Sequence, residues 1–233
     1  KSSALGSFFR AHPGAGMLGI YDEAVNMTNG ATQGWASTHF RNKPGMKLET
    51  LSLPLELVAS RLSGGGAQLT ERLKDFPNIA MWVQAIRAKT VGRVTRSILG
   101  RPVVHYSMCD SDLDCMIEGV QILARMHFEV GAKYVIPGIS GLPYSLDRDQ
   151  IDLLKGASRD PRAWTSILSH LFGGCVTGVD PGRSVVDPRG WVHGYENLMV
   201  ADASAIPTTL GVNPQHTIMG LARVRAWELL GAS

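Results

Sequence analysis

The sequence predicts a mixed α/β fold in which helices pack against β-sheet. Three observations support this prediction: a strand-turn-strand pattern within residues 89–108, a long amphipathic helix pattern over residues 111–131, and an apolar strand followed by a second helix near the C-terminus. The chain has 233 residues, of which 44% are hydrophobic. That is enough to bury a substantial core, which excludes a disordered chain and a miniprotein held together by disulfides.

The first pattern contains two short strands. Val91, Val94 and Ile98 come before Gly100-Arg101-Pro102, a sequence typical of a turn, and the apolar run Val103-Val104-His105-Tyr106 comes after it. We expect two antiparallel strands around this turn.

The second pattern is the clearest helix. Ser111 with Asp114 resembles an N-terminal capping box, and Gly131 stands where glycine commonly follows a helix. Apolar residues recur between them at spacings of three and four: Leu113, Met116, Ile117, Val120, Leu123 and Ala124. We expect this apolar face to pack on a sheet.

The third pattern combines strands with a helix. Residues 184–192 predict two strands joined by a turn, and residues 197–201 predict a buried strand that ends at Asp202. Asn213-Pro214 opens a helix, with Pro214 at the first helical position. A buried strand, a loop and a helix N-terminus together favour an anion-binding or cofactor-binding arrangement.

One glycine motif matches the residue spacing of a dinucleotide-binding fingerprint but lacks its sequence context. Gly14-Ala15-Gly16-Met17-Leu18-Gly19 has the spacing, but His12-Pro13 precedes it and no helical apolar face follows. The fingerprint requires a buried strand before it and a helix that opens within it. We therefore interpret these residues as a glycine-rich loop.

Charge and cysteine usage exclude several classes of function. The net charge is only +3 and no block of Lys or Arg occurs, so nothing indicates a nucleic-acid binder. Cys109, Cys115 and Cys175 are odd in number and lack a Cys-x-x-Cys pair, which argues against a disulfide framework or a zinc site. No apolar run approaches the roughly 18 residues of a transmembrane helix, so we expect a soluble protein.

The composition and the first residues suggest a missing partner. Only 18% of the residues are charged, which indicates that some surface is hidden against a partner. The chain starts at Lys1 without a methionine, as though cut from something longer.

Four separate segments form a recognisable series: His170-Leu171-Phe172-Gly173-Gly174-Cys175, then Val185-Val186-Asp187, then Asn197-Leu198-Met199-Val200-Ala201-Asp202-Ala203-Ser204, and finally Asn213-Pro214-Gln215-His216-Thr217-Ile218. In their order and spacing they resemble the C-terminal part of the glucose-methanol-choline (GMC) flavoprotein oxidoreductases. The Gly-Gly-Cys and Asn-Pro forms look closest to the cholesterol-oxidase-like and alcohol-oxidase-like branches.

The resemblance implies how the chain is organised. Residues 1–20 and 161–233 would belong to an FAD-binding, Rossmann-like domain, and residues 21–160 to a substrate domain with an antiparallel sheet backed by helices. The family's N-terminal half, which carries the FAD fingerprint, is absent. The resemblance therefore implies a complementary N-terminal chain as partner and FAD as cofactor.

The resemblance also assigns the catalytic pair. His170 would take the hydroxyl proton of an alcohol while hydride passes to flavin N5, and Asn213 would hold the substrate oxygen. An imidazole suits the first role because it titrates near neutral pH. Two structural alternatives stay open: His170 bonded to a backbone carbonyl, and Asn213 acting as an N-cap.

Further positions would contact the cofactor. Ala203 would donate its N–H to a phosphate, with the Asp202 carboxylate on hydroxyls or backbone; the alternative is that Asp202 caps its own loop. Asn213, Pro214, Gln215 and His216 would lie at the helix start that faces the flavin, and His216 is a rival base. The other histidines show no metal-ligand spacing and are interpreted as surface or core-edge residues: His12, His39, His105, His127 and His193.

Two other functions remain possible from the sequence. A lyase that cleaves cyanohydrins uses the same scaffold without redox chemistry, and a flavin-free fragment would not be an enzyme. The substrate would be a small alcohol, and a hydrophobic one if Phe40, Met81, Trp82 and Trp164 line a pocket rather than the core.

Overall fold

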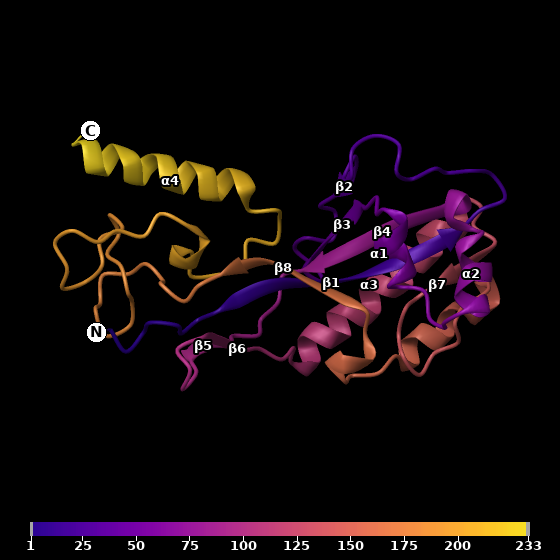
Figure 1. Cartoon of the computed structure of the whole chain (residues 1–233), viewed down its shortest axis with the longest axis horizontal. Coiled ribbons are helices and arrows are strands. Elements are labelled where there is room, and N and C mark those ends of the chain that lie inside the picture. The colour runs from indigo at the N-terminus through magenta and orange to yellow at the C-terminus, as the bar shows by residue number, and fades with distance from the viewer. Residues whose placement is uncertain (1, 232–233) are drawn as a thin grey trace. The chain divides into compact units, whose positions relative to one another are not determined.

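The computed structural model describes residues 2–231 and shows a chain that folds as two units, each built from distant parts of the sequence (Figure 1). The sheet unit contains Pro13–Ile86 and Asp110–Ile167, and the terminal unit contains the residues up to His12, Arg87–Cys109 and the residues from Leu168 onward. The sequence predicts one segment over residues 21–160, whereas the structure groups residues 87–109 with the terminal unit. Which unit belongs to which domain stays a prediction.

A six-stranded sheet forms the centre of the sheet unit, in the order β2-β3-β4-β1-β7 with β8 also paired to β1. Strand β1 pairs antiparallel with β4 and β7, and β3 pairs antiparallel with β2 and β4. The strands are β1 (Arg10–Ile20), β2 (Ala36–Ser37), β3 (Met46–Thr50), β4 (Ile79–Ile86), β7 (Tyr134–Ile136) and β8 (Ser166–Phe172). The first residues of β1 and most of β8 belong to the terminal unit. The predicted antiparallel sheet is confirmed.

The glycine motif lies inside β1, so the predicted glycine-rich loop is wrong. The motif is no fingerprint either, because no helix opens within it. Its glycines allow other groups to approach the strand closely. A Cβ on Gly19 would overlap the His127 ring, and a Cβ on Gly14 would overlap the Gln84 carbonyl oxygen. The sequence lacks the alternation of polar and apolar residues that marks a strand with one exposed face, because both faces of β1 are covered.

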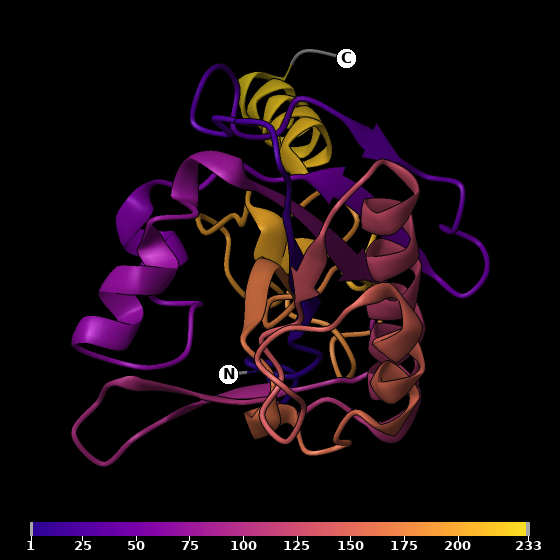
Figure 2. The same cartoon turned by 90° about the vertical axis from the view of Figure 1, so that its right-hand side faces the viewer.

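Helices cover the two faces of the sheet (Figure 2). Helices α1 (Leu55–Ala59) and α2 (Ala67–Leu73) contribute Val58, Leu69 and Leu73 to a cluster with Leu18 and Met81 of the sheet. Helix α3 (Asp110–Glu129) packs on β4 from the other face, where the Gln84 amide donates to the Met116 carbonyl over 2.7 Å. Short 3₁₀ turns complete the unit: η1 (Phe76–Asn78), η2 (Arg148–Gly156) and η3 (Pro161–Ala163).

The predicted helix over residues 111–131 is confirmed with one correction. Helix α3 begins at Asp110, so Ser111 lies in its first turn and the predicted capping box is wrong. Gly131 follows the helix with φ of +94°, a left-handed conformation that suits glycine. The six predicted apolar residues are buried, as their periodicity requires.

A buried histidine ties α3 to β1. The Tyr21 hydroxyl donates to Nδ1 of His127 over 2.8 Å, and Nε2–H of His127 donates to the Met17 carbonyl at 3.2 Å. The Trp82 ring stacks on the imidazole, with 4.0 Å between ring centroids. Burial lowers the pKa of His127 from 6.5 to about 4 and raises the pKa of Tyr21 to about 12. The predicted core-edge histidine is in fact a fully buried one.

This histidine predicts an acid-sensitive fold. Between about pH 6.5 and 4 the unfolded His127 binds a proton that the folded protein does not, so the free energy of unfolding falls as pH falls. We expect a loss of about 3 kcal/mol across that interval from this group. Urea unfolding near pH 7.5 and pH 4.5 should show a larger loss for wild type than for His127→Gln, whose amide can replace both hydrogen bonds. Equal losses would contradict the assignment.

The terminal unit contains a hairpin, irregular loops and one long helix. Strands β5 (Arg93–Arg96) and β6 (Pro102–His105) pair antiparallel, as predicted. Residues 184–192 form the predicted reversal with single bridges rather than regular strands, Val186 opposite Val192. The predicted buried strand at 197–201 is wrong: Leu198 is 46% exposed, and Met199 makes one bridge, to Trp191. An apolar run becomes a buried strand only where other strands flank it.

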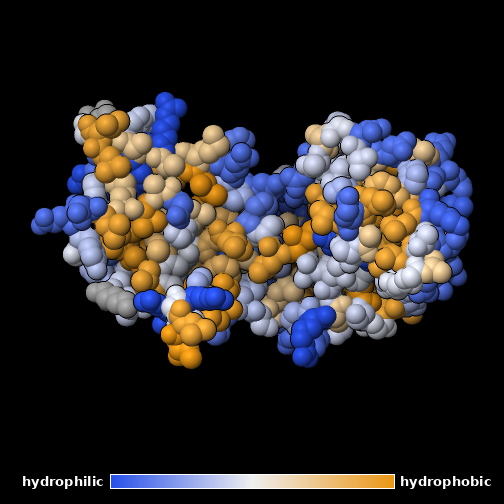
Figure 3. Space-filling model, viewed as in Figure 1, coloured by the Kyte–Doolittle hydropathy of each residue, from blue (hydrophilic) through white to orange (hydrophobic). Residues whose placement is uncertain are grey.

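The C-terminal helix presents apolar side chains to solvent. Helix α4 (Gln215–Leu230) buries Arg225, whose guanidinium donates to the Pro188 carbonyl over 2.6 Å, and packs Leu221 on a small cluster with Val185 and Ala205. Its Trp227 and Leu230 are exposed, as is Ile98 at the hairpin tip, and Figure 3 shows apolar surface over these parts. No helix within residues 2–231 has the length and apolarity needed to cross a bilayer.

Candidate functional site

Backbone hydrogen bonds bring two of the four sequence segments together in the terminal unit. The N–H groups of Cys175 and Thr177 donate to the carbonyls of Ser204 and Ala205, both over 3.0 Å, and Gly173 N–H donates to the Ala203 carbonyl. The Val185 N–H donates to the Val176 carbonyl over 2.9 Å, which adds the third segment. Residues separated by about thirty positions in the sequence therefore lie side by side.

His170 lies in β8 with an unusual backbone. Its φ is +52°, a left-handed conformation that few residues other than glycine adopt. Strain of this kind costs on the order of 1 kcal/mol and is found at functional sites. The following Gly173 has φ of +77°, and a Cβ there would overlap the Phe8 carbonyl oxygen. The His-x-x-Gly spacing thus fits a sharply turned segment that holds a half-buried imidazole.

A second histidine, His12, supports His170. The two Nδ1 atoms are 3.4 Å apart, and the rings meet edge to face with centroids separated by 5.4 Å. His12 is 2% exposed and also packs against Phe172. The N–H of Gly211 donates to Nε2 of His12 over 3.1 Å. His12 therefore links His170 to the loop that leads into α4.

The hydrogen bonds assign the proton positions of the two rings. A backbone N–H can only donate, so Nε2 of His12 is an acceptor and the ring proton of neutral His12 is on Nδ1. That proton points to Nδ1 of His170, which must then accept. A neutral His170 in this arrangement carries its own proton on Nε2.

Asn213 follows Gly211 by two residues and is half-buried. Helix α4 begins at Gln215, and Pro214 is its N-cap. The prediction that Pro214 occupies the first helical position is therefore wrong by one residue. The alternative role of Asn213 as the N-cap does not apply for the same reason. Pro214 is buried, whereas Gln215 and His216 are exposed in the first turn.

Asp202 uses one carboxylate oxygen to cap its own loop. Its Oδ1 accepts the Ser204 N–H over 2.7 Å, at the start of the 3₁₀ turn η4 (Ala203–Ala205). The sequence alternative that Asp202 caps its loop is therefore observed. The same bond fixes Ala203 and Ser204 beside Gly173 and Cys175.

The terminal unit offers space for a cofactor next to these segments. A cavity of about 820 Å³ is lined by Gly173, Gly174, Cys175 and Ser204 together with the N-terminal segment and β5. Gly174 has φ of +97°, and a Cβ there would meet only Gly6 Cα, at 4.0 Å. The first N–H groups of the 16-residue helix α4 have no carbonyl partner within the helix, which suits a negatively charged or electron-rich group.

His12 is the residue that sequence reasoning missed. The sequence predicts a surface or core-edge histidine here, because no spacing connects position 12 with position 170. The connection arises from tertiary structure: His12 in β1 meets both His170 in β8 and Gly211 in the loop.

Comparisons with known proteins support a common ancestry. A family model described as GMC oxidoreductase matches residues 88–222. An uncharacterized GMC-type oxidoreductase of Mycobacterium tuberculosis is 32% identical over 219 residues, which cover 94% of this chain and 34% of that protein. A long-chain-alcohol oxidase of Arabidopsis thaliana is 25% identical, covering 95% of this chain and 31% of that protein. The chain thus spans about a third of the length of these relatives.

Solved structures share the fold at low sequence identity. The crystal structure of pyridoxine 4-oxidase from Mesorbium loti aligns with a TM-score of 0.66 and 14% identity, over 99% of this chain and 44% of that one. A formate oxidase structure aligns with a TM-score of 0.67 and 14% identity, over 99% of this chain and 48% of that one.

Proposed function

The chain belongs to the GMC oxidoreductase family, and on that premise we propose that it supplies the substrate-binding and catalytic part of an FAD-dependent enzyme that oxidises an alcohol. FAD, when bound, accepts hydride from the alcohol carbon at its N5 atom. The terminal unit would belong to the flavin domain and the sheet unit to the substrate domain.

One observation carries the proposal: the buried His12 connects His170 with the loop that contains Asn213. Oxidation of an alcohol needs groups that hold the oxygen and remove its proton, and these must act on the same atom. The two predicted catalytic residues come from segments about forty positions apart, and a shared hydrogen-bond partner supports their acting together. Asn213 would hold the oxygen by donating its amide N–H.

Two roles are open to His170. The resemblance implies that it takes the hydroxyl proton, which requires a lone pair on the nitrogen facing the substrate. The hydrogen bonds around His12 favour the other role, since they leave a proton on Nε2 of His170 that would be donated to the oxygen. A side chain that donates a hydrogen bond but cannot accept a proton could replace His170 in the second role and not in the first.

The remaining predicted positions would hold the cofactor. Ala203 would donate its N–H to a phosphate, and Asp202, already bonded to Ser204 N–H, would act by fixing that turn. Asn213, Pro214, Gln215 and His216 would bring the positive end of α4 toward the flavin ring. His216 as a rival base remains a weaker proposal, because it is exposed on the first turn.

A complementary N-terminal region would complete the protein. The chain covers about a third of its relatives' length, and α4 exposes Trp227, Leu229 and Leu230 in the described structure. Apolar residues at such density usually lie against another surface. We propose that a region carrying the FAD fingerprint covers this helix.

The proposed substrate is a hydrophobic alcohol. Relatives named as a long-chain-alcohol oxidase and as cholesterol oxidases favour this class, the latter at 45% identity over 56 residues. In the sheet unit, Trp82 lines an apolar cavity with Leu48 and Met126, whereas Met81 and Trp164 belong to the core.

Anaerobic reduction of the flavin tests the proposal. The chain is combined with its N-terminal region and FAD, then mixed with 1-hexadecanol or cholesterol in detergent. We expect the flavin absorbance to bleach with one of these alcohols. Cleavage of a cyanohydrin without bleaching would instead indicate a lyase, and a preparation that binds no flavin would indicate a fragment that is not an enzyme.

A further inference from the structure

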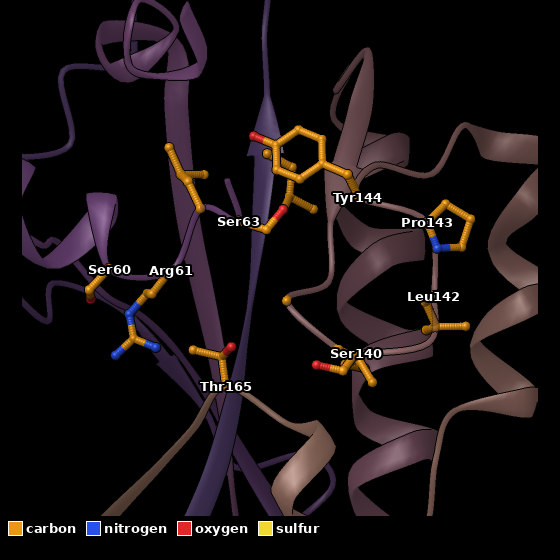
Figure 4. A pocket seen from close by; sticks show the side chains of 12 residues that line it. Ser60, Arg61, Ser63, Ser140, Leu142, Pro143, Tyr144 and Thr165 are labelled. Carbon is orange, nitrogen blue, oxygen red and sulfur yellow. The ribbon is translucent and has the colours of Figure 1, made fainter. Parts of the chain in front are cut away.

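A cleft in the sheet unit contains the guanidinium of Arg61, for which the described residues provide no ion-pair partner. The cleft has a volume of about 240 Å³ and lies between the segment after α1, the loop after β7 and Thr165. Figure 4 shows the Arg61 side chain at this cleft together with Thr165, Ser140, Ser63 and Tyr144. A volume of this size suits a small ligand.

The Arg61 guanidinium is partly desolvated without compensation. Its Nε is buried and has no hydrogen-bond partner, and no carboxylate within residues 2–231 forms an ion pair with it. None of the residues that line the cleft is acidic. Partial burial lowers the pKa of Arg61 from its usual value. An anion in the cleft would give this half-buried guanidinium the hydrogen-bond partner that it lacks.

The surroundings add donors and a second cation. Ser60, Ser63, Ser140 and Thr165 contribute hydroxyl groups to the cleft. Arg72 lies at its rim, where the guanidinium stacks on Tyr144 at 3.5 Å from the ring centroid and donates to the Ser63 hydroxyl over 2.9 Å. Arg72 therefore adds positive charge beside the cleft, although one of its N–H donors is already bonded to Ser63.

The apolar residues that line the cleft favour an organic anion over an inorganic one. Leu62, Ile136, Ile139, Leu142 and Pro143 line the same cleft, so about half of its residues are apolar. A guanidinium fork matches a carboxylate in two parallel hydrogen bonds, and apolar walls match a hydrocarbon body. We propose that this cleft binds a small organic carboxylate, with Arg61 pairing to the carboxylate group and Leu142 and Pro143 contacting the body.

Calorimetric titration with benzoate, on the chain combined with its N-terminal region, tests this site, and it needs no alcohol substrate. We expect saturable binding of benzoate and none of benzamide, which has the same shape without the charge. Arg61→Gln should weaken benzoate binding by about tenfold or more. Arg159→Gln is the matched control, because Arg159 is an exposed arginine of the same unit that pairs with Asp114.

Each outcome decides the proposal. Equal binding of benzoate by wild type and Arg61→Gln, equal binding of benzamide and benzoate, or equally tight binding of sulfate would overturn it. If Arg61→Gln does not fold by circular dichroism, Arg61→Lys replaces it and should bind benzoate less tightly than wild type, since an ammonium lacks the two-pronged geometry. The benzamide comparison uses only the wild-type protein with its N-terminal region and stands in either case.

Discussion

Replacing His170 with alanine should slow anaerobic flavin reduction by about 10²- to 10⁴-fold while FAD stays bound. The reason is that either proposed role, proton acceptor or donor to the oxygen, needs an imidazole at this position. Stopped-flow absorbance measures the rate, and the flavin-to-protein ratio measures the bound cofactor. His39→Ala is the control, because His39 is an exposed histidine of the sheet unit with no place in the proposed site. Unchanged reduction in His170→Ala would remove His170 from the mechanism.

His170→Gln separates the two roles. A glutamine amide can donate to an oxygen but cannot take up a proton. If His170 acts as the base, glutamine should be as slow as alanine. If it acts through Nε2–H, as the bonds to His12 favour, glutamine should recover a measurable part of the rate.

The second large effect is expected at His12, which acts as a positioning residue. His12→Leu removes the donor to His170 and leaves the buried Gly211 N–H without an acceptor. A misplaced reacting group costs on the order of 10² in rate, so we expect a decrease of that size in the rate constant with a smaller change in KM.

His12→Gln tests whether the hydrogen bonds or only the volume matter. The glutamine oxygen can accept from Gly211 N–H and its amide can donate to His170, so activity should recover by several-fold over the leucine variant. Thermal unfolding of both variants serves as control. Equal activity in His12→Gln and His12→Leu, at matched stability, would reduce His12 to a packing residue.

The sequence predicted elements best where a local pattern determines structure. Helix α3 follows its apolar periodicity and its glycine end, and the β5–β6 hairpin follows its Gly-Arg-Pro turn. The prediction of a loop at the glycine motif was wrong because Gly14 and Gly19 make room for Gln84 and His127. These two residues lie far away in the sequence, so the pattern could not reveal the contacts. The strand at 197–201 failed because an apolar run does not reveal whether neighbouring strands are present.

The sequence could predict which residues form the candidate site, but not which of them contact each other. The segments around His170 and Asn213 carry recognisable spacing, whereas His12 carries none and is placed only by the meeting of β1 with β8 and the loop at Gly211. Arg61 was equally invisible, because an arginine among exposed residues and one beside a cleft look alike in a sequence. Burial and missing partners distinguish them only in three dimensions.

A crystal structure of the chain together with its N-terminal region, FAD and a bound alcohol would test the central claim most directly. The account predicts that Nε2 of His170 and the side-chain amide nitrogen of Asn213 each lie about 2.6–3.2 Å from the same substrate oxygen. An oxygen within reach of neither group, or the two side chains turned toward separate cavities, would contradict it.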